Sequence, residues 1–286
     1  MDIVKKYLTN GQYLTQKFEK ISQFLHHTIS TNAMSAWRWW NATPERVGTP
    51  YIIDRDGSII ECFDPRMWAY HLGIKGDDNY HEKHSINTEL VSAGPLRFEN
   101  HEFRFYPLWP NKIRWTAIPE EEVHIFSKPW KGHLYWHLYT EDQLESLKWL
   151  IGRNALDFPN LGIENDIESI FEYNEDVVKK HLPGIWAHCT VRKDKSDVFP
   201  YPPLIKALKE VQEELTDIRK DKNEASVKIA PKDPNLRGMA SVEASVIKPK
   251  PKTVSKPKTK KVTKPKTTGA KKTTKPVSKS SKSLKS

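Results

Sequence analysis

The spacing of apolar and polar residues predicts short β-strands in the first part of the chain. Residues 21–26 are apolar and β-prone, which predicts a strand that brings His26 to its end. Residues 51–53 and 59–60 flank an Asp-Gly pair at 56–57, and such a pair between two apolar runs is typical of a β-hairpin. We therefore expect a strand that ends in polar residues, followed by a hairpin.

Helical spacing occurs in three further segments. Residues 33–40 predict a short helix rich in aromatic side chains. Thr140 begins a capping box with Gln143, and apolar residues then follow at helical spacing. After a proline pair at 202–203, apolar residues recur every three or four positions up to Ile218, which predicts a longer helix that closes the domain or packs on a partner. Strands that alternate irregularly with helices favour an α/β (α+β) fold class, in which one mixed central β-sheet is flanked by helices.

Composition separates the C-terminal segment from the rest. The 286 residues have a mean hydropathy of −0.69, with 46 basic and 36 acidic side chains. Residues 248–286 hold 15 of the lysines and no acidic residue, so the preceding residues carry 31 basic side chains against all 36 acidic ones. This Lys/Pro-rich segment has too few apolar residues to form a core. We expect one folded domain at 1–223, a linker at 224–247 and a disordered basic tail at 248–286.

Three observations bear on the cellular setting. Residues 1–6 lead into polar sequence, without the apolar stretch of a secretory signal. No apolar run approaches the roughly 18 residues that a membrane span requires. Two cysteines, Cys62 and Cys189, are too few for a disulfide framework. We therefore expect a chain that is made in the cytoplasm, with neither a secretory signal nor a membrane span.

Candidate chemistry centres on the histidines. A catalytic zinc site needs three ligands from His, Cys or carboxylate side chains and leaves a fourth position to water. The chain has 11 histidines, and a single histidine is more often a surface or core residue than a ligand, so its neighbours must select it. Five segments rich in reactive side chains occur in the order 24–28 (Phe-Leu-His-His-Thr), 51–57, 68–73 (Trp-Ala-Tyr-His-Leu-Gly), 85–90 (Ser-Ile-Asn-Thr-Glu-Leu) and 188–197.

The ordered set of segments resembles the N-acetylmuramoyl-L-alanine amidase family over about residues 12–210. This family comprises phage endolysins, the bacterial cytoplasmic muropeptide-recycling amidase and animal peptidoglycan recognition proteins. Each segment alone is a weak signal, whereas the ordered set is specific. The resemblance implies a zinc-dependent amidase that cleaves peptidoglycan between N-acetylmuramic acid and L-alanine.

The resemblance implies three protein ligands for one Zn²⁺ ion, namely His26, His188 and Asp197. Many relatives carry cysteine at the third position, but zinc also accepts a carboxylate. His27 is the alternative to His26, although neighbours on a strand face opposite sides and only one can reach the metal. For the same reason Cys189, next to His188, is expected to be a small buried side chain rather than a ligand.

The resemblance also implies two catalytic residues. Glu89 takes the position of the catalytic glutamate and is expected to accept a proton from the attacking water and pass it to the leaving amine. Lys195 is expected to stabilise the oxyanion of the tetrahedral intermediate. On an extended segment Lys193 and Lys195 would both point to the side of Asp197, and the family pattern selects Lys195.

Substrate binding is assigned by the same resemblance to His71. Trp68 and Tyr70 are candidate platforms for sugar rings, although aromatic residues in such a segment are at least as often part of the core. Thr49 stands where some relatives have an active-site tyrosine, which places more of the chemistry on the glutamate. The pair at 87–88, Asn-Thr, replaces a glycine followed by an apolar residue.

The expected function is that of a phage-type lytic endolysin, because residues 37–40 and 43–49 look most like phage members of the family. Such a protein would bind peptidoglycan as a monomer and act on the cell wall after holin-dependent release. A cytoplasmic recycling amidase and a non-catalytic peptidoglycan-binding module are the alternatives. The basic tail is expected to bind an anionic wall polymer or nucleic acid, or only to keep the protein in solution.

Overall fold

A six-stranded mixed β-sheet forms the centre of the fold. A computed structural model describes residues 2–9, 11–100, 104–107 and 117–229. Neighbouring strands follow the order β1 (Ile3–Lys5), β4 (Ile59–Glu61), β3 (Tyr51–Ile53), β5 (Ser85–Val91), β2 (Ser22–Thr28) and β10 (Gly184–Ala187). The strands β3 and β4 pair antiparallel, and the other neighbours pair parallel. The predicted central mixed sheet is therefore confirmed.

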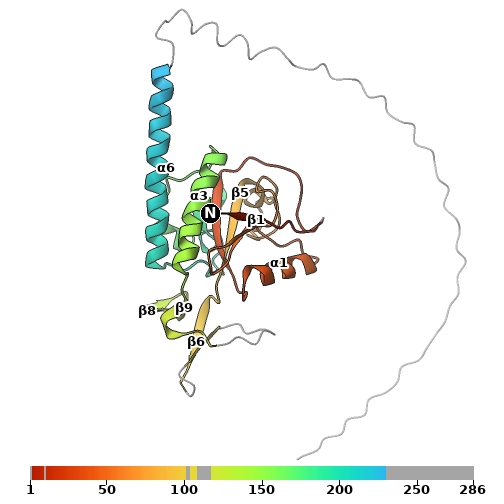
Figure 1. The fold of residues 1–286 in the computed structure, drawn as a ribbon, viewed down its shortest axis with the longest axis vertical. Helices are drawn as coiled ribbons and strands as arrows, with labels where there is room; N and C mark the ends of the chain where they lie inside the picture. Colours follow the sequence, from red (N-terminus) through yellow and green to blue (C-terminus); the bar gives the residue numbers. More distant parts are fainter. Residues whose placement is uncertain (1, 10, 101–103, 108–116, 230–286) are drawn as a thin grey trace, which may run out of the picture. The chain divides into compact units, whose positions relative to one another are not determined.

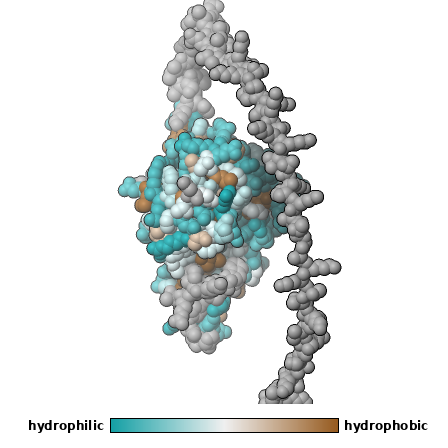
Figure 2. All heavy atoms as spheres, turned by 90° about the vertical axis from the view of Figure 1, so that its right-hand side faces the viewer, coloured by the Kyte–Doolittle hydropathy of each residue, from teal (hydrophilic) through white to brown (hydrophobic). Residues whose placement is uncertain are grey.

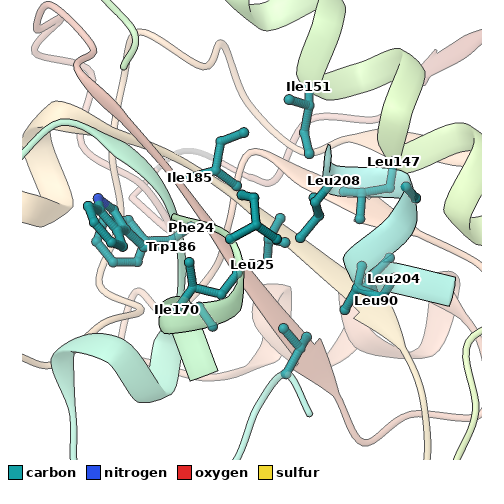
Figure 3. Close-up of a cluster of buried hydrophobic side chains, with 14 of the residues drawn as sticks. Phe24, Leu25, Leu90, Leu147, Ile151, Ile170, Ile185, Trp186, Leu204 and Leu208 are labelled. Carbon is teal, nitrogen blue, oxygen red and sulfur yellow. The ribbon is translucent and has the colours of Figure 1, made fainter. Parts of the chain in front are cut away.

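Helices cover both faces of this sheet. The helix α3 (Glu141–Asp157) lies on one face, and α6 (Pro202–Ile229) runs beside α3 (Figure 1). Figure 3 shows how their leucine and isoleucine side chains pack on strand residues such as Leu25 and Ile185. On the opposite face α1 (Ala33–Ala42) packs through Trp40 on Ile52 and Ile60. Three short helices complete the fold, α2 (Tyr80–His84), α4 (Glu175–Lys179) and α5 (His188–Val191).

The structure also contains a second, four-stranded antiparallel sheet, whereas the sequence predicted a single sheet. Its strands follow the order β7 (Arg104–Pro107), β6 (Pro95–Glu99), β9 (His133–His137) and β8 (Val123–Trp130). Arg55, in the turn of the predicted hairpin, binds two residues that flank the second sheet, Glu122 just before β8 and Leu138 just after β9. Its guanidinium donates to Glu122 Oε2 at 2.5 Å and to the carbonyl of Leu138 at 2.9 Å. The prediction of one sheet is therefore incomplete.

The local sequence signals correspond to the observed hairpin turn and helix starts. The hairpin pairs Tyr51 with Glu61 and Ile53 with Ile59. The capping box at the start of α3 is present, because Thr140 Oγ1 accepts from the Gln143 amide at 3.1 Å and the Gln143 side chain accepts from the Thr140 amide at 3.1 Å. These predictions are confirmed, and so are the helices that follow residues 32 and 201.

The described surface is mainly polar. On the face drawn in Figure 2 hydrophilic residues predominate and apolar ones are scattered between them, as on most folded proteins. Within the described residues, none of the helices combines the length and the apolar character that a membrane crossing requires. The helix α6 continues past residue 223, where the end of the folded domain was expected, to Ile229. The predicted tail at 248–286 lies outside the described residues.

Candidate metal centre and active site

Three parallel strands deliver the central side chains of the site to one edge of the sheet. His26 lies near the end of β2 and is the register partner of Glu89 on β5. The strand β10 pairs with β2 up to Ala187, and His188 follows directly at the start of α5. Asp197 returns to this edge from the next loop, where its carbonyl accepts a hydrogen bond from the Cys189 amide at 3.1 Å. Strand ends that meet at one edge therefore bring distant parts of the chain together.

The three predicted ligands form one compact cluster. His26 Nδ1 lies 3.1 Å from His188 Nδ1, and Asp197 Oδ2 lies 2.9 Å from His188 Nδ1 and 3.7 Å from His26 Nδ1. The three atoms that face one another all lie within 4.8 Å. The two histidine side chains are 2% and 4% exposed, and that of Asp197 is 13% exposed. The cluster is thus buried, and the carboxylate is its most exposed member.

The donor and acceptor pattern of this cluster suits a cation. His188 Nε2 is 3.0 Å from the carbonyl oxygen of Leu72, which can only accept, so Nε2 carries a proton. A neutral His188 ring then turns a lone pair toward a carboxylate, and the two repel each other unless a positive charge lies between them. Burial lowers the pKa of His26 well below its usual range, so a second proton is not readily taken up there. Two imidazole nitrogens and one carboxylate oxygen are ligands that zinc uses in catalytic sites.

Asp197 is held in its charged form. Burial raises the pKa of this carboxyl, but beside a protonated His188 the positive charge and the hydrogen bond of that ring outweigh burial and hold the pKa well below the usual range. Beside a neutral His188 the carboxylate lacks this counter-charge, and another cation must supply it. A permanently charged carboxylate in a buried place needs a partner of opposite charge. The site therefore has the charge as well as the ligand atoms for a divalent metal.

Unpartnered polar atoms surround the cluster. Within the described residues six buried side-chain nitrogen or oxygen atoms have no hydrogen-bond partner, and His27 Nδ1, His71 Nε2, Glu89 Oε2 and Tyr139 OH are among them. The ring of His71 contacts that of His26 edge to face. The negative charge of Asp197 raises the pKa of each of the other three side chains. Buried groups without partners are rare unless water, an ion or a ligand satisfies them. Their grouping here marks a place where a ligand or water completes the structure.

Glu89 has the properties of a group that exchanges protons near neutral pH. Burial raises the pKa of Glu89 to about 8, the negative charge of Asp197 adds to this effect, and the ammonium of Lys195 opposes it. A carboxyl group with a pKa near the working pH can both accept and donate a proton. The catalytic role of Glu89 stays a prediction, and the raised pKa agrees with it.

The two lysines of the loop do not share a direction. The loop turns, with the Lys195 amide donating to the Arg192 carbonyl at 3.2 Å, so the expectation of an extended segment is wrong. Lys193 Nζ lies 4.6 Å from the centre of the Tyr173 ring. Lys195 is half-buried and close enough to lower the pKa of Glu89. Of the two, Lys195 is the one whose charge is felt at the site.

The predicted substrate residues have different positions. The side chain of His71 is 3% exposed, its Nδ1 donates to the Ala69 carbonyl at 2.7 Å, and burial lowers its pKa to about 3. Trp68 is only 6% exposed, and Lys83 Nζ lies 5.5 Å from the centre of its ring. The largely buried ring of Trp68 agrees with the alternative that it belongs to the core, and its role as a sugar platform stays a prediction. Tyr70 is 38% exposed, and its substrate contact stays a prediction.

The two alternative ligands lie outside the cluster. His27 turns toward Gly94, where an added Cβ would meet His27 Nε2 at 2.6 Å. Cys189 lies on the short helix α5, so the argument from strand alternation does not apply to it. Its Sγ nevertheless points away, 3.5 Å from the carbonyl oxygen of Phe171, and burial raises its pKa to about 12. That neither His27 nor Cys189 is a metal ligand stays a prediction, and the geometry agrees with it.

Sequence reasoning missed several residues that shape the site. Asn87 accepts a hydrogen bond from His26, and Glu82 accepts from the backbone amides of residues 71–73, whose loop carries the carbonyl that His188 contacts. Residues 85, 87 and 89 are polar in a strand with period two, and this stripe could have indicated a shared polar face. Tyr139 precedes a helix cap and gave no such signal.

Comparison with known proteins gives one family match. A family model described as N-acetylmuramoyl-L-alanine amidase matches residues 22–200. No curated protein matches the chain. Solved structures that are similar include PlyL (11% identity, 73% of this chain, 97% of that chain, TM-score 0.42) and the N-acetylmuramoyl-L-alanine amidase LysC from Clostridium intestinale URNW (14%, 76%, 98%, 0.39). A selenomethionine derivative of AmpD is a third (13%, 72%, 93%, 0.38). At these identities and scores the structural similarities say nothing about activity.

Proposed function

The chain belongs to the N-acetylmuramoyl-L-alanine amidase family, and from this premise we propose that it is a zinc-dependent hydrolase of the amide bond between N-acetylmuramic acid and L-alanine. The observation that carries the zinc proposal is the cluster of His26, His188 and Asp197, whose three ligand atoms face one another within 4.8 Å. The family match supports amidase action on peptidoglycan. The cluster supports a metal, and its two nitrogens and one oxygen favour zinc.

Each side chain around the cluster has its own proposed role in the hydrolysis. A bound zinc ion would supply a Lewis acid that polarises the scissile carbonyl and acidifies water. Glu89 takes the proton of the attacking water and later gives it to the nitrogen of alanine as that nitrogen leaves. Lys195 places its positive charge near the carbonyl oxygen, on which negative charge develops. The buried, unpartnered Nε2 of His71 is an acceptor for a substrate N–H or O–H group.

Metal content and product analysis test this proposal together. Purified protein should hold about one zinc ion per chain, and His26→Ala should lose both zinc and activity. His84→Ala is the matched control, because the ring of His84 contacts the carbonyl of Glu19 and lies outside the cluster. Mass spectrometry of a peptidoglycan digest should show free L-alanine amino termini. A fully zinc-loaded but inactive His26→Ala protein, or cleavage at another bond, would contradict the proposal.

We also propose a lytic role of phage type rather than recycling of muropeptides. Residues 37–40 and 43–49 resemble phage members, and recycling has no evident need for the lysine-rich segment 248–286. A non-catalytic wall-binding protein has no need for a complete ligand set, which this chain retains. Activity on intact cell walls would support the lytic role. Activity restricted to soluble muropeptides would favour the recycling alternative.

A further inference from the structure

Asn87 is a buried amide that no catalytic step uses. It lies on β5 beside Phe24 of β2 and is fully buried. Its Oδ1 is 3.0 Å from His26 Nε2, on the side of the ring that faces away from His188 and Asp197. Its Nδ2 donates to Ser85 Oγ at 2.7 Å. Asn87 therefore connects a predicted ligand to a chain of hydrogen bonds that leads away from the site.

The direction of every hydrogen bond in this chain follows from its far end. Ser85 Oγ lies 2.5 Å from the carbonyl oxygen of His81, and a carbonyl only accepts, so the serine hydroxyl donates there. The serine oxygen then has only lone pairs left for Asn87, which must offer its NH₂ group. The carbonyl oxygen of the Asn87 side chain is thereby turned toward His26. An oxygen acceptor at this position requires a proton on His26 Nε2.

A proton on Nε2 of neutral His26 leaves the lone pair on Nδ1, the atom that faces the cluster. The opposite tautomer has its own attraction, because Asp197 Oδ2 lies 3.7 Å from His26 Nδ1 and would stabilise a proton there. A proton on Nδ1 would block the nitrogen that a metal needs. The contact with Asn87 opposes this tautomer.

We propose that Asn87 is a positioning residue that fixes the Nε2-protonated tautomer of His26 and so keeps Nδ1 free for a metal. His188 needs no side-chain partner to fix its tautomer, because the backbone carbonyl of Leu72 accepts the hydrogen bond from its Nε2 proton. The two ligand rings are thus oriented by different means, one of which a substitution can remove. The inference rests on the metal site of the proposed function. Outer partners of ligand histidines generally contribute 10-fold to 100-fold in metal affinity, and the same range is expected here.

Four variants separate positioning from packing. Asn87→Leu keeps a similar volume and removes the acceptor, whereas Asn87→Asp keeps an oxygen toward His26. Ser85→Ala leaves Asn87 in place but removes the hydroxyl that orients its amide. Thr88→Val is the matched control, because Thr88 is a buried polar residue on the same strand that faces the other side of the sheet.

The readouts are the zinc dissociation constant, from competition with a chelator, and the ¹⁵N spectrum of the His26 ring in metal-free protein, assigned by comparison with His26→Ala. Wild type should show a proton on Nε2. Asn87→Leu should shift the ring toward Nδ1 protonation and weaken zinc binding by about 10-fold to 100-fold. Ser85→Ala should change both readouts in the same direction, Asn87→Asp should restore them, and Thr88→Val should leave them unchanged.

A wild-type ring protonated on Nδ1 would overturn the proposal, and so would an Asn87→Leu protein with unchanged zinc affinity. Weaker zinc binding in Asn87→Leu without a change of tautomer, or without rescue by Asn87→Asp, would show a role in packing only and would also overturn it. The tautomer is read without metal. If wild type held no zinc while its ring carried the Nε2 proton, the proposed function would fail and the orientation by Asn87 would still stand.

Discussion

Glu89→Gln should stabilise the metal-free protein at alkaline pH while it abolishes turnover. In the folded protein burial raises the pKa of Glu89 to about 8, whereas an unfolded glutamate titrates near 4.5. Between these values the unfolded chain releases the proton and the folded chain keeps it. The wild type therefore loses stability as the pH rises from about 4.5 to about 8, and the loss levels off above that. A glutamine at this position stays neutral at every pH and lacks this dependence.

The magnitude follows from the two pKa values. A shift from 4.5 to about 8 corresponds to about 5 kcal/mol once both states have titrated. Between pH 5 and pH 8.5 the variant should gain on the wild type by about 4 kcal/mol as an upper limit. Because Glu89 is not fully buried and water can relax around it, a gain of about 2 kcal/mol or more is expected in practice.

Urea unfolding of metal-stripped wild type and Glu89→Gln at both pH values measures this gain. Substitution costs that do not depend on pH cancel when each protein is compared with itself. Added zinc should reduce the gain, since a nearby cation favours the charged carboxylate. The reasoning would be refuted if the stability difference between the two proteins stayed constant from pH 5 to pH 8.5, or if the wild type gained on the variant. In the activity assay the same variant should lose at least a hundredfold in kcat.

Three further predictions concern other parts of the protein. Lys195→Met should lower kcat by about a hundredfold to a thousandfold with little change in KM, measured by steady-state kinetics on a soluble muropeptide; a normal kcat would remove Lys195 from catalysis. Gly94→Ala should lower the free energy of unfolding by about 1 to 3 kcal/mol more than Gly132→Ala in thermal or urea unfolding, because both have positive φ but only Gly94 faces His27 at 2.6 Å. Deletion of residues 248–286 should leave hydrolysis of soluble fragments intact and weaken wall binding in sedimentation assays; an advantage of the full chain that persisted in high salt would contradict a role through charge.

Local patterns in the sequence were sufficient for the elements whose signals lie within a few residues. The Asp-Gly turn, the Thr140 capping box and the proline pair before α6 each act on neighbouring backbone groups, and each corresponds to the observed structure. The second sheet had no such signal. Most residues of β8 are partly or fully exposed and a proline interrupts the strand, so no clear alternation of apolar and polar residues indicates it.

The sequence by itself determined which side chains the site contains, because the ordered segments selected His26, His188, Asp197 and Glu89 from many candidates. The tertiary structure alone decided how these side chains are oriented and which charge they carry. Hydrogen-bond partners 61 and 116 residues away determine which nitrogen of each ring faces the cluster. The pKa of Glu89 depends on burial and on charges that other loops bring near it. The identity of the site residues can be recognised in the sequence. The tautomer of each histidine, the charge of each carboxyl group and the direction of each side chain depend on partners from distant segments, and no local pattern specifies those partners.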